Sequence, residues 1–178
     1  MKTAVAILGL TLCLIVPRVQ AADAPPKPSP EIQKMGIFAG KWHLEEEDEA
    51  TPFGPAGKST MESQIRFAHD GFALEENGKG KDSSGKPVSY TIVYFYDPGA
   101  KSLRSFVYDN SGGAFLTTGT LDGNSWKNHW TQQLNGKDYK CKGVSTVTPD
   151  GKKFNYEWSY SEDGVTWKPM FKGTATKG

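Results

Sequence analysis

Cysteine is nearly absent from this chain of 178 residues, which contains only Cys13 and Cys141. Cys13 lies in an N-terminal segment that we expect to be removed, as argued below, so Cys141 has no partner for an intramolecular disulfide. A lone cysteine can act as a nucleophile, form an intermolecular bridge or serve as a small buried hydrophobe. Because Lys140 and Lys142 alternate with it along a predicted strand, we interpret Cys141 as buried.

Histidine is also scarce, and the three present are His43, His69 and His129. None lies in a Gly-x-Ser-x-Gly sequence or another serine-hydrolase signature. His69 falls in a predicted turn, and His129 alternates with tryptophans that we expect to point inward, so both should face water. With no catalytic signature in the sequence, we expect that the protein is not an enzyme.

One histidine has acidic neighbours at a spacing that a metal ion can use. His43, Glu45 and Glu47 share one face of a predicted strand and would offer an imidazole and two carboxylates to a divalent cation. They also belong to an acidic run that extends to Glu49, and such runs are typical of solvated strand ends that discourage edge pairing. We favour the second interpretation and predict no metal site.

Neither sign of charge predominates. The whole chain has 21 basic and 20 acidic residues, and residues 22–178 have 19 and 20. This balance excludes electrostatic attraction to nucleic acid or to anionic lipid as the main function.

The chain has one long apolar run, from residue 4 to residue 17. Its length is about 14 residues, short of the roughly 20 that span a bilayer as a helix. Lys2 precedes the run, and Val19 and Ala21 are small residues at the two positions that a signal peptidase reads. We therefore predict that residues 1–21 are a signal peptide cleaved after Ala21, and that the protein is secreted or periplasmic with no membrane anchor.

The next segment changes from linker to helix. Residues 22–29 are rich in proline and favour neither helix nor strand, so they are predicted to be a linker, and residues 30–178 a single domain. Ser29 is a predicted N-cap and Pro30 a first helical residue, with Ile32 and Met35 on one face. Gly40 is predicted to end this short helix.

After Gly40 the apolar residues follow a twofold period, which is typical of strands. Turn sequences such as Asp70-Gly71 and Asn135-Gly136 recur every 10 to 15 residues, and together with the loop 52–55 they give nine connections. The ten strands are predicted to start near Lys41, Lys58, Phe72, Val88, Ser102, Ala114, Ser125, Tyr139, Lys153 and Trp167. Hairpins in sequence make an up-and-down antiparallel meander, and closure into a barrel would remove its two exposed edges. A two-layer sandwich is the alternative.

Alternation along these strands predicts an aromatic interior. All 21 aromatic residues follow residue 21, and several share a strand face with one another while polar residues occupy the opposite face. The predicted interior residues, which are also candidate ligand contacts, are Tyr90, Tyr94, Trp126, Trp130, Tyr156 and Trp158.

Arginine is limited to Arg66 and Arg104 after residue 21, and both fall within predicted strands. An arginine inside a barrel can stack on an indole and close one end, or it can bind a ligand carboxylate. We choose Arg104 as the candidate because Phe106 and Tyr108 share its face. We favour the structural role for it and keep it among the candidate ligand contacts.

The sequence Gly40-Lys41-Trp42, after a short helix and at the start of the first strand, resembles the Gly-x-Trp start of the calycin superfamily, which includes lipocalins and fatty-acid-binding proteins. With the ten-strand meander, the Tyr96-Asp97-Pro98 turn and the signal peptide, the chain more closely resembles uncharacterised secreted bacterial domains of calycin-like fold that are distantly similar to nitrobindin. The resemblance covers roughly residues 31–174. It implies an all-β, ten-stranded antiparallel up-and-down calycin-like barrel with a short N-terminal helix. Gly40 and Trp42 are its structural motif.

Nitrobindin-like proteins bind haem through a histidine late in the barrel. This sequence has no histidine after His129. We therefore expect no haem and no other cofactor.

Two functions fit these observations. The first is a secreted or periplasmic barrel that binds a small apolar or aromatic molecule in its interior, which the aromatic lining and the resemblance favour. The alternative is a barrel with a filled core that acts through its surface as an interaction or envelope-associated module, without ligand or catalysis. An internal cavity of several hundred Å³ would distinguish them.

Overall fold

The computed structural model describes residues 26–178, and it forms a closed barrel of ten antiparallel strands. The predicted signal peptide and residues 22–25 of the predicted linker lie outside the described residues. The strands are β1 (Gly40–Asp48), β2 (Gly57–Ala68), β3 (Ala73–Lys81), β4 (Pro87–Asp97), β5 (Ser102–Asp109), β6 (Ala114–Asp122), β7 (Ser125–Leu134), β8 (Lys137–Val147), β9 (Lys153–Ser161) and β10 (Lys168–Lys177). Every strand pairs with its neighbour in sequence, and β1 pairs with β10, so the barrel prediction is confirmed and the sandwich is excluded.

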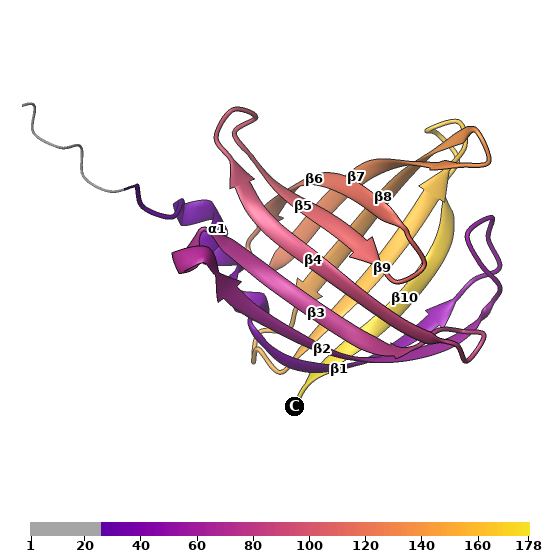
Figure 1. The fold of residues 1–178 in the computed structure, drawn as a ribbon, viewed down its shortest axis with the longest axis horizontal. Helices are drawn as coiled ribbons and strands as arrows, with labels where there is room; N and C mark the ends of the chain where they lie inside the picture. Colours follow the sequence, from indigo (N-terminus) through magenta and orange to yellow (C-terminus); the bar gives the residue numbers. More distant parts are fainter. Residues whose placement is uncertain (1–25) are drawn as a thin grey trace, which may run out of the picture.

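The barrel carries short helical segments at one end (Figure 1). Helix α1 (Pro30–Lys34) continues as the 3₁₀ segment η1 (Met35–Phe38), and a second 3₁₀ turn, η2 (His69–Gly71), joins β2 to β3. The Ser29 hydroxyl accepts a hydrogen bond from the Ile32 amide at 3.2 Å, which is the predicted N-cap. Ile32, Met35 and Phe38 are buried, so these segments close this end of the barrel. Among residues 26–178 there is no helix long and apolar enough to cross a membrane.

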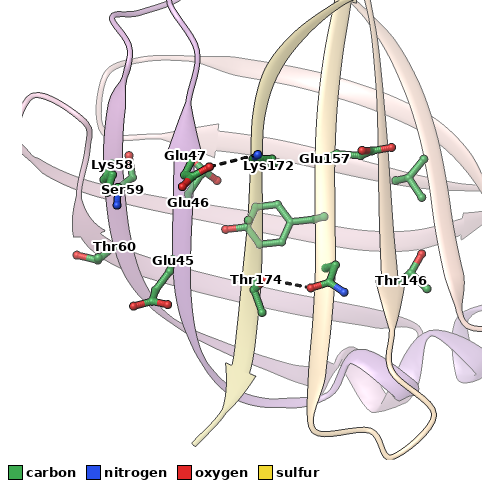
Figure 2. Close-up of a pocket in the computed structure, with 14 residues that line it drawn as sticks. Glu45, Glu46, Glu47, Lys58, Ser59, Thr60, Thr146, Glu157, Lys172 and Thr174 are labelled. Carbon is green, nitrogen blue, oxygen red and sulfur yellow. Dashed lines mark hydrogen bonds and ion pairs between the residues drawn. The ribbon is translucent and has the colours of Figure 1, made fainter.

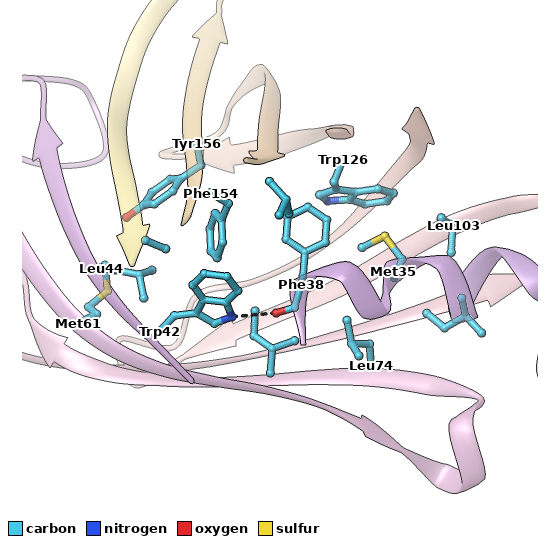
Figure 3. Packing of buried hydrophobic residues seen from close by; sticks show 14 residues of the cluster. Met35, Phe38, Trp42, Leu44, Met61, Leu74, Leu103, Trp126, Phe154 and Tyr156 are labelled. Carbon is cyan, nitrogen blue, oxygen red and sulfur yellow. Dashed lines mark hydrogen bonds between the residues drawn. The ribbon is translucent and has the colours of Figure 1, made fainter. Parts of the chain in front are cut away.

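Trp42 anchors the core beneath these helical segments (Figure 3). Its side chain is 0% exposed, and its indole N–H donates a hydrogen bond of 2.8 Å to the Phe38 carbonyl. Phe154 packs edge-on against it with ring centroids 4.8 Å apart. Lys177, from β10, places its ammonium group 5.1 Å from the indole centroid. The first strand, the last strand and the helical cap therefore meet at one tryptophan.

A second apolar cluster fills part of the opposite end. It consists of Trp130, Tyr139, Cys141 and Tyr160, with Phe53, Phe115, Leu134, Trp158 and Met170 packed against it. Cys141 is buried, as predicted, and burial raises the pKa of its thiol to about 11. The interior between the two clusters is where the barrel is hollow.

Candidate functional site in the barrel interior

A cavity of about 250 Å³ lies inside the barrel between the helical cap and the second cluster. All ten strands and η1 contribute to its wall, which is mainly apolar and aromatic. Its lining residues are Met35, Phe38, Leu44, Glu46, Met61, Ile65, Glu76, Tyr90, Ile92, Tyr94, Val107, Asp109, Phe115, Trp126, Ser145, Phe154, Tyr156, Trp158 and Phe171.

The structure brings together five of the seven residues that the sequence singled out as candidate contacts. Tyr90 and Tyr94 lie on β4, Trp126 on β7, and Tyr156 and Trp158 on β9, and all five line the cavity. Alternation placed them correctly because each strand is buried on the face that points into the barrel.

Trp130 is buried but does not line the cavity, contrary to expectation. It stacks on Phe115 with centroids 5.1 Å apart and packs edge-on against Trp158 at 4.7 Å. Phe115 and Trp158 thus separate Trp130 from the hollow part of the interior, since both of them line the cavity. Its role is to fill one end of the barrel.

Arg104 also lies away from the cavity. On β5 the buried residues are Leu103, Ser105 and Val107, so Arg104 points to the outer face. There it donates a hydrogen bond of 2.9 Å to Asp97, across the β4–β5 pair. The indole of Trp42 is covered by Lys177 instead of an arginine, so the expectation that Arg104 closes the barrel end is wrong.

The principal polar group of the cavity is a carboxylate that sequence reasoning did not select. Glu76 on β3 is only 6% exposed. Its Oε1 accepts hydrogen bonds of 2.9 Å from both the Ser63 and the Tyr90 hydroxyls, and its Oε2 accepts one of 3.0 Å from Tyr94. Burial raises the pKa of Glu76, and these three donors oppose the rise. Burial and the nearby Glu76 charge raise the pKa of both tyrosines.

A second carboxylate, Glu46 on β1, lines the same cavity. Burial, followed by the neighbouring Asp48, raises the pKa of Glu46 to about 8. Burial and the charge of Glu46 raise the pKa of Tyr156 as well. The Tyr156 side chain is 8% exposed, and its buried hydroxyl has no hydrogen-bond partner of acceptable geometry. An unpaired hydroxyl of this kind is costly to bury, and the Glu46 carboxyl group lies beside it.

The acidic run at the end of the first strand is therefore only partly solvated, which corrects the sequence-based interpretation. Glu45 and Glu47 are exposed, whereas Glu46 follows Trp42 and Leu44 along the inward face. The sequence contained this information, because every second residue of a strand points the same way and Glu46 is in step with Trp42 and Leu44. The same parity places Glu76 on the inward face with Leu74, while Glu75 points outward.

A recess of about 290 Å³ lies next to the cavity, between the connections 49–56 and 82–86 at the end opposite the helical cap. Cavity and recess share Glu46, Met61 and Phe171 in their walls, so Glu46 lies at the junction between them. The recess adds three further carboxylates, those of Asp48, Glu49 and Asp82. We refer to this recess, which adjoins the cavity and has acidic walls, as the entrance.

A larger depression is an open groove of about 660 Å³ over β1, β2, β8, β9 and β10 (Figure 2). Glu46 and Tyr156 contribute to its wall as well as to that of the cavity. Its walls carry both charges, and Lys172 pairs with Glu47 at 3.3 Å. His43, also on the outer face of β1, lies 2.6 Å from Glu62. In the described part of the chain, no group of three or more His, Cys, Asp or Glu side chains is arranged to hold a metal ion. Because it is open and its walls are charged and polar, this groove is a weaker candidate site for an apolar molecule than the interior.

The fold has counterparts among solved structures. The crystal structure of Rv2717c from M. tuberculosis is 15% identical, with a TM-score of 0.62, and the match covers 85% of this chain and 99% of that one. A redesigned beta barrel, mFAP0, bound to DFHBI is 12% identical with a TM-score of 0.45, and covers 79% of this chain and 99% of its own. The structure of EF1p2_mFAP2b bound to DFHBI is 14% identical with a TM-score of 0.41, and covers 83% and 99%. At these identities the first comparison supports the fold alone.

Sequence comparison identifies the family. No curated protein matches the chain. The family described as "Protein of unknown function (DUF1579)" matches residues 27–177, nearly all of the described residues. The chain therefore belongs to the DUF1579 family, whose fold here is a closed ten-stranded barrel of calycin-like type.

Proposed function

We propose that the barrel binds one small, largely apolar organic molecule in its interior and performs no chemistry on it. The observation that carries this proposal is the cavity of about 250 Å³, whose wall is formed mainly by aliphatic and aromatic side chains. Its size lies just below the range of roughly 300–1,000 Å³ that is usual for ligand pockets. A ligand of about one or two rings would suit it.

The open space between the two apolar clusters argues against the alternative function, in which the core is filled. The second cluster does fill one end of the interior with Trp130, Tyr139 and Tyr160. The central space remains open, however, and the entrance recess adjoins it with three wall residues in common. A core selected only for packing would not leave a space of this size, because interiors are otherwise close-packed.

A neutral aromatic probe tests this proposal. We expect 2-naphthylmethanol to bind the folded protein at one saturable site in isothermal titration calorimetry, and to change the fluorescence of Trp126 and Trp158, which line the cavity. The larger side chain in Val107→Phe would occupy part of the cavity and should weaken binding by about tenfold or more. Val93→Phe is the matched control, because Val93 points outward on β4, next to the inward Ile92. If 2-naphthylmethanol instead binds both variants equally and without saturation, the interior is not its binding site, and the alternative of a function at the surface is favoured.

We also propose that the protein is exported. The support is the apolar run that ends in Val19-Gln20-Ala21, outside the described residues. Amino-terminal sequencing of the protein recovered from its host should give Ala22 as the first residue. Recovery of an intact Met1 would contradict export by this signal.

A further inference from the structure

The ionisable side chains that line the cavity and its entrance are carboxyl groups and tyrosines, and none of them is basic. Six carboxylates line the two spaces, and among the described lining residues there is no lysine, arginine or histidine. The six are Glu46, Asp48, Glu49, Glu76, Asp82 and Asp109. Within residues 26–178, none of these carboxylates lies within 4.0 Å of a basic group. The chain as a whole is nearly neutral, so this segregation is not a consequence of composition.

Some of these carboxylates have a local structural role. Asp82 accepts hydrogen bonds from the Ser84 and Lys86 amides, and Asp109 accepts them from the Ser111 and Gly113 amides, so both stabilise turns. Asp82 still contributes negative charge to the entrance, and Asp109 contributes it to the cavity. No turn requires the other two cavity carboxylates, Glu46 and Glu76, which lie within strands.

A buried carboxylate without a counter-ion is costly, because desolvation disfavours its charged form. This cavity nevertheless contains two such carboxyl groups, those of Glu46 and Glu76, together with the unpaired hydroxyl of Tyr156. The aromatic walls add a further attraction for positive charge, since the faces of tryptophan and tyrosine rings bind cations. Carboxylate, free hydroxyl and aromatic face are together the groups that recognise an ammonium ion attached to an apolar body.

On the basis of the proposed function, we propose that the ligand is a small organic amine that binds as its ammonium cation beside Glu46 and Tyr156, with its apolar part against the aromatic wall. The ammonium group donates hydrogen bonds to the Glu46 carboxylate and to the Tyr156 hydroxyl. Glu76 is a second carboxyl group in the same cavity, held in place by Ser63, Tyr90 and Tyr94. The acidic entrance attracts cations and repels anions of the same size.

Three probes with a common naphthalene ring test the charge preference at pH 8 by calorimetry. They are 2-naphthylmethylamine, 2-naphthylmethanol and 2-naphthoate. We expect the amine to bind about tenfold or more tightly than the alcohol, as one charge-assisted hydrogen bond would provide, and the carboxylate to bind more weakly than the alcohol.

Substitutions then test which residues cause the preference for the amine over the alcohol. Glu46→Gln should lower the ratio of amine to alcohol affinity to near unity, and Tyr156→Phe should lower it in part. Glu45→Gln is the control, because it removes the same charge from the outer face of the same strand; the ratio should be unchanged. A preference that survives in Glu46→Gln would overturn the assignment of the ammonium position.

The outcomes separate this inference from the proposed function. If the alcohol binds and the amine binds no more tightly, the amine inference fails and the interior binding site stands. If none of the three probes binds, both fail. The ranking of the three probes on the unaltered protein gives this answer even where a variant does not fold.

Discussion

Glu45 and Glu46 are neighbours in sequence, yet their environments are opposite. Glu45 is exposed on the outer face of β1, and Glu46 faces the cavity beside Asp48 and Tyr156. The pKa of Glu46, raised to about 8 from an ordinary value of 4.5, means that the folded protein holds this proton more tightly than the unfolded chain does. A residue of this kind makes the stability of the fold depend on pH.

The first prediction concerns this dependence. Between about pH 5 and pH 8 the unfolded chain has released the Glu46 proton while the folded protein retains it, so stability should fall as pH rises. At about 1.4 kcal/mol per pKa unit, the loss is on the order of 4 kcal/mol across this window. Above about pH 8 the contribution of Glu46 becomes constant. Urea titrations at pH 5, 6.5 and 8 measure the slope.

Glu46→Gln should remove this part of the slope and be more stable than the unaltered protein at pH 8. Glu45→Gln should leave the slope as it is. Glu76, whose pKa is also raised, adds a slope of the same sign in all three proteins. Identical slopes in the unaltered protein and Glu46→Gln would show that Glu46 is ionised in the fold at all of these pH values.

At the scale of the strand, glycines opposite aromatic residues shape the interior. Gly78 pairs with Tyr90, Gly143 with Trp158 and Gly173 with Tyr156. A Cβ atom at Gly173 would lie 2.4 Å from the Tyr156 ring, and one at Gly143 would lie 2.9 Å from the Trp158 ring. The rings therefore lie flat over the adjacent strand, which leaves the centre of the barrel free.

The second prediction tests this arrangement. Gly143→Ala should destabilise the protein by about 1–3 kcal/mol, the usual cost of overpacking, because Trp158 and Asn128 must both move. Gly54→Ala is the control, since a Cβ there meets nothing within 4 Å, and its effect should stay within about 0.5 kcal/mol. Denaturant titration compares the two. If Gly143→Ala is as stable as Gly54→Ala, the side chains around Gly143 can shift to accommodate a Cβ atom at no cost in stability.

The sequence predicted the strands well because their boundaries are set locally. Turn sequences, the loop 52–55 and the change of period after Gly40 placed all ten strand starts within two residues of those observed. Alternation also placed Tyr94 and Tyr156 in the cavity. The interpretation failed for Glu46 because its place in an acidic run was taken as a sign of exposure, although the backbone parity of its strand points it inward. Glu76 points inward by the same rule, and sequence reasoning did not select it. The contacts of Trp130 depend on how strands from across the barrel meet, which no local pattern contains.

For the molecule as a whole, the notable property is the separation of charge. Residues 22–178 have nearly equal numbers of acidic and basic residues, yet the entrance and cavity carry only acidic ones among the described lining residues. Lysines lie on the outer face, as Lys58 and Lys172 do in the open groove. A cation approaching the entrance therefore meets a field that a neutral molecule of the same shape does not experience.

The third prediction follows from this field and rests on the amine inference. Raising the salt from about 0.05 M to about 1 M shortens the screening length to about 3 Å. The affinity for 2-naphthylmethylamine should then fall several-fold, while that for 2-naphthylmethanol should not fall. Calorimetry at the two salt concentrations measures both. A parallel change for the two probes would indicate that the entrance carboxylates do not act on the ligand.

The pairing of β1 with β10 also determines when the barrel can close during synthesis of the chain. Trp42 is opposite Lys177 and Asp48 is opposite Phe171, so the first strand finds its outer partner only among the last residues of the chain. Ribosomes deliver a chain from its N-terminus, and contacts between distant residues form slowly. Until residues 171–177 have emerged, β1 and β9 are both open edges able to pair with another molecule. The completed protein has no such edge within its barrel, and the period of greatest exposure to aggregation ends with the arrival of its final strand.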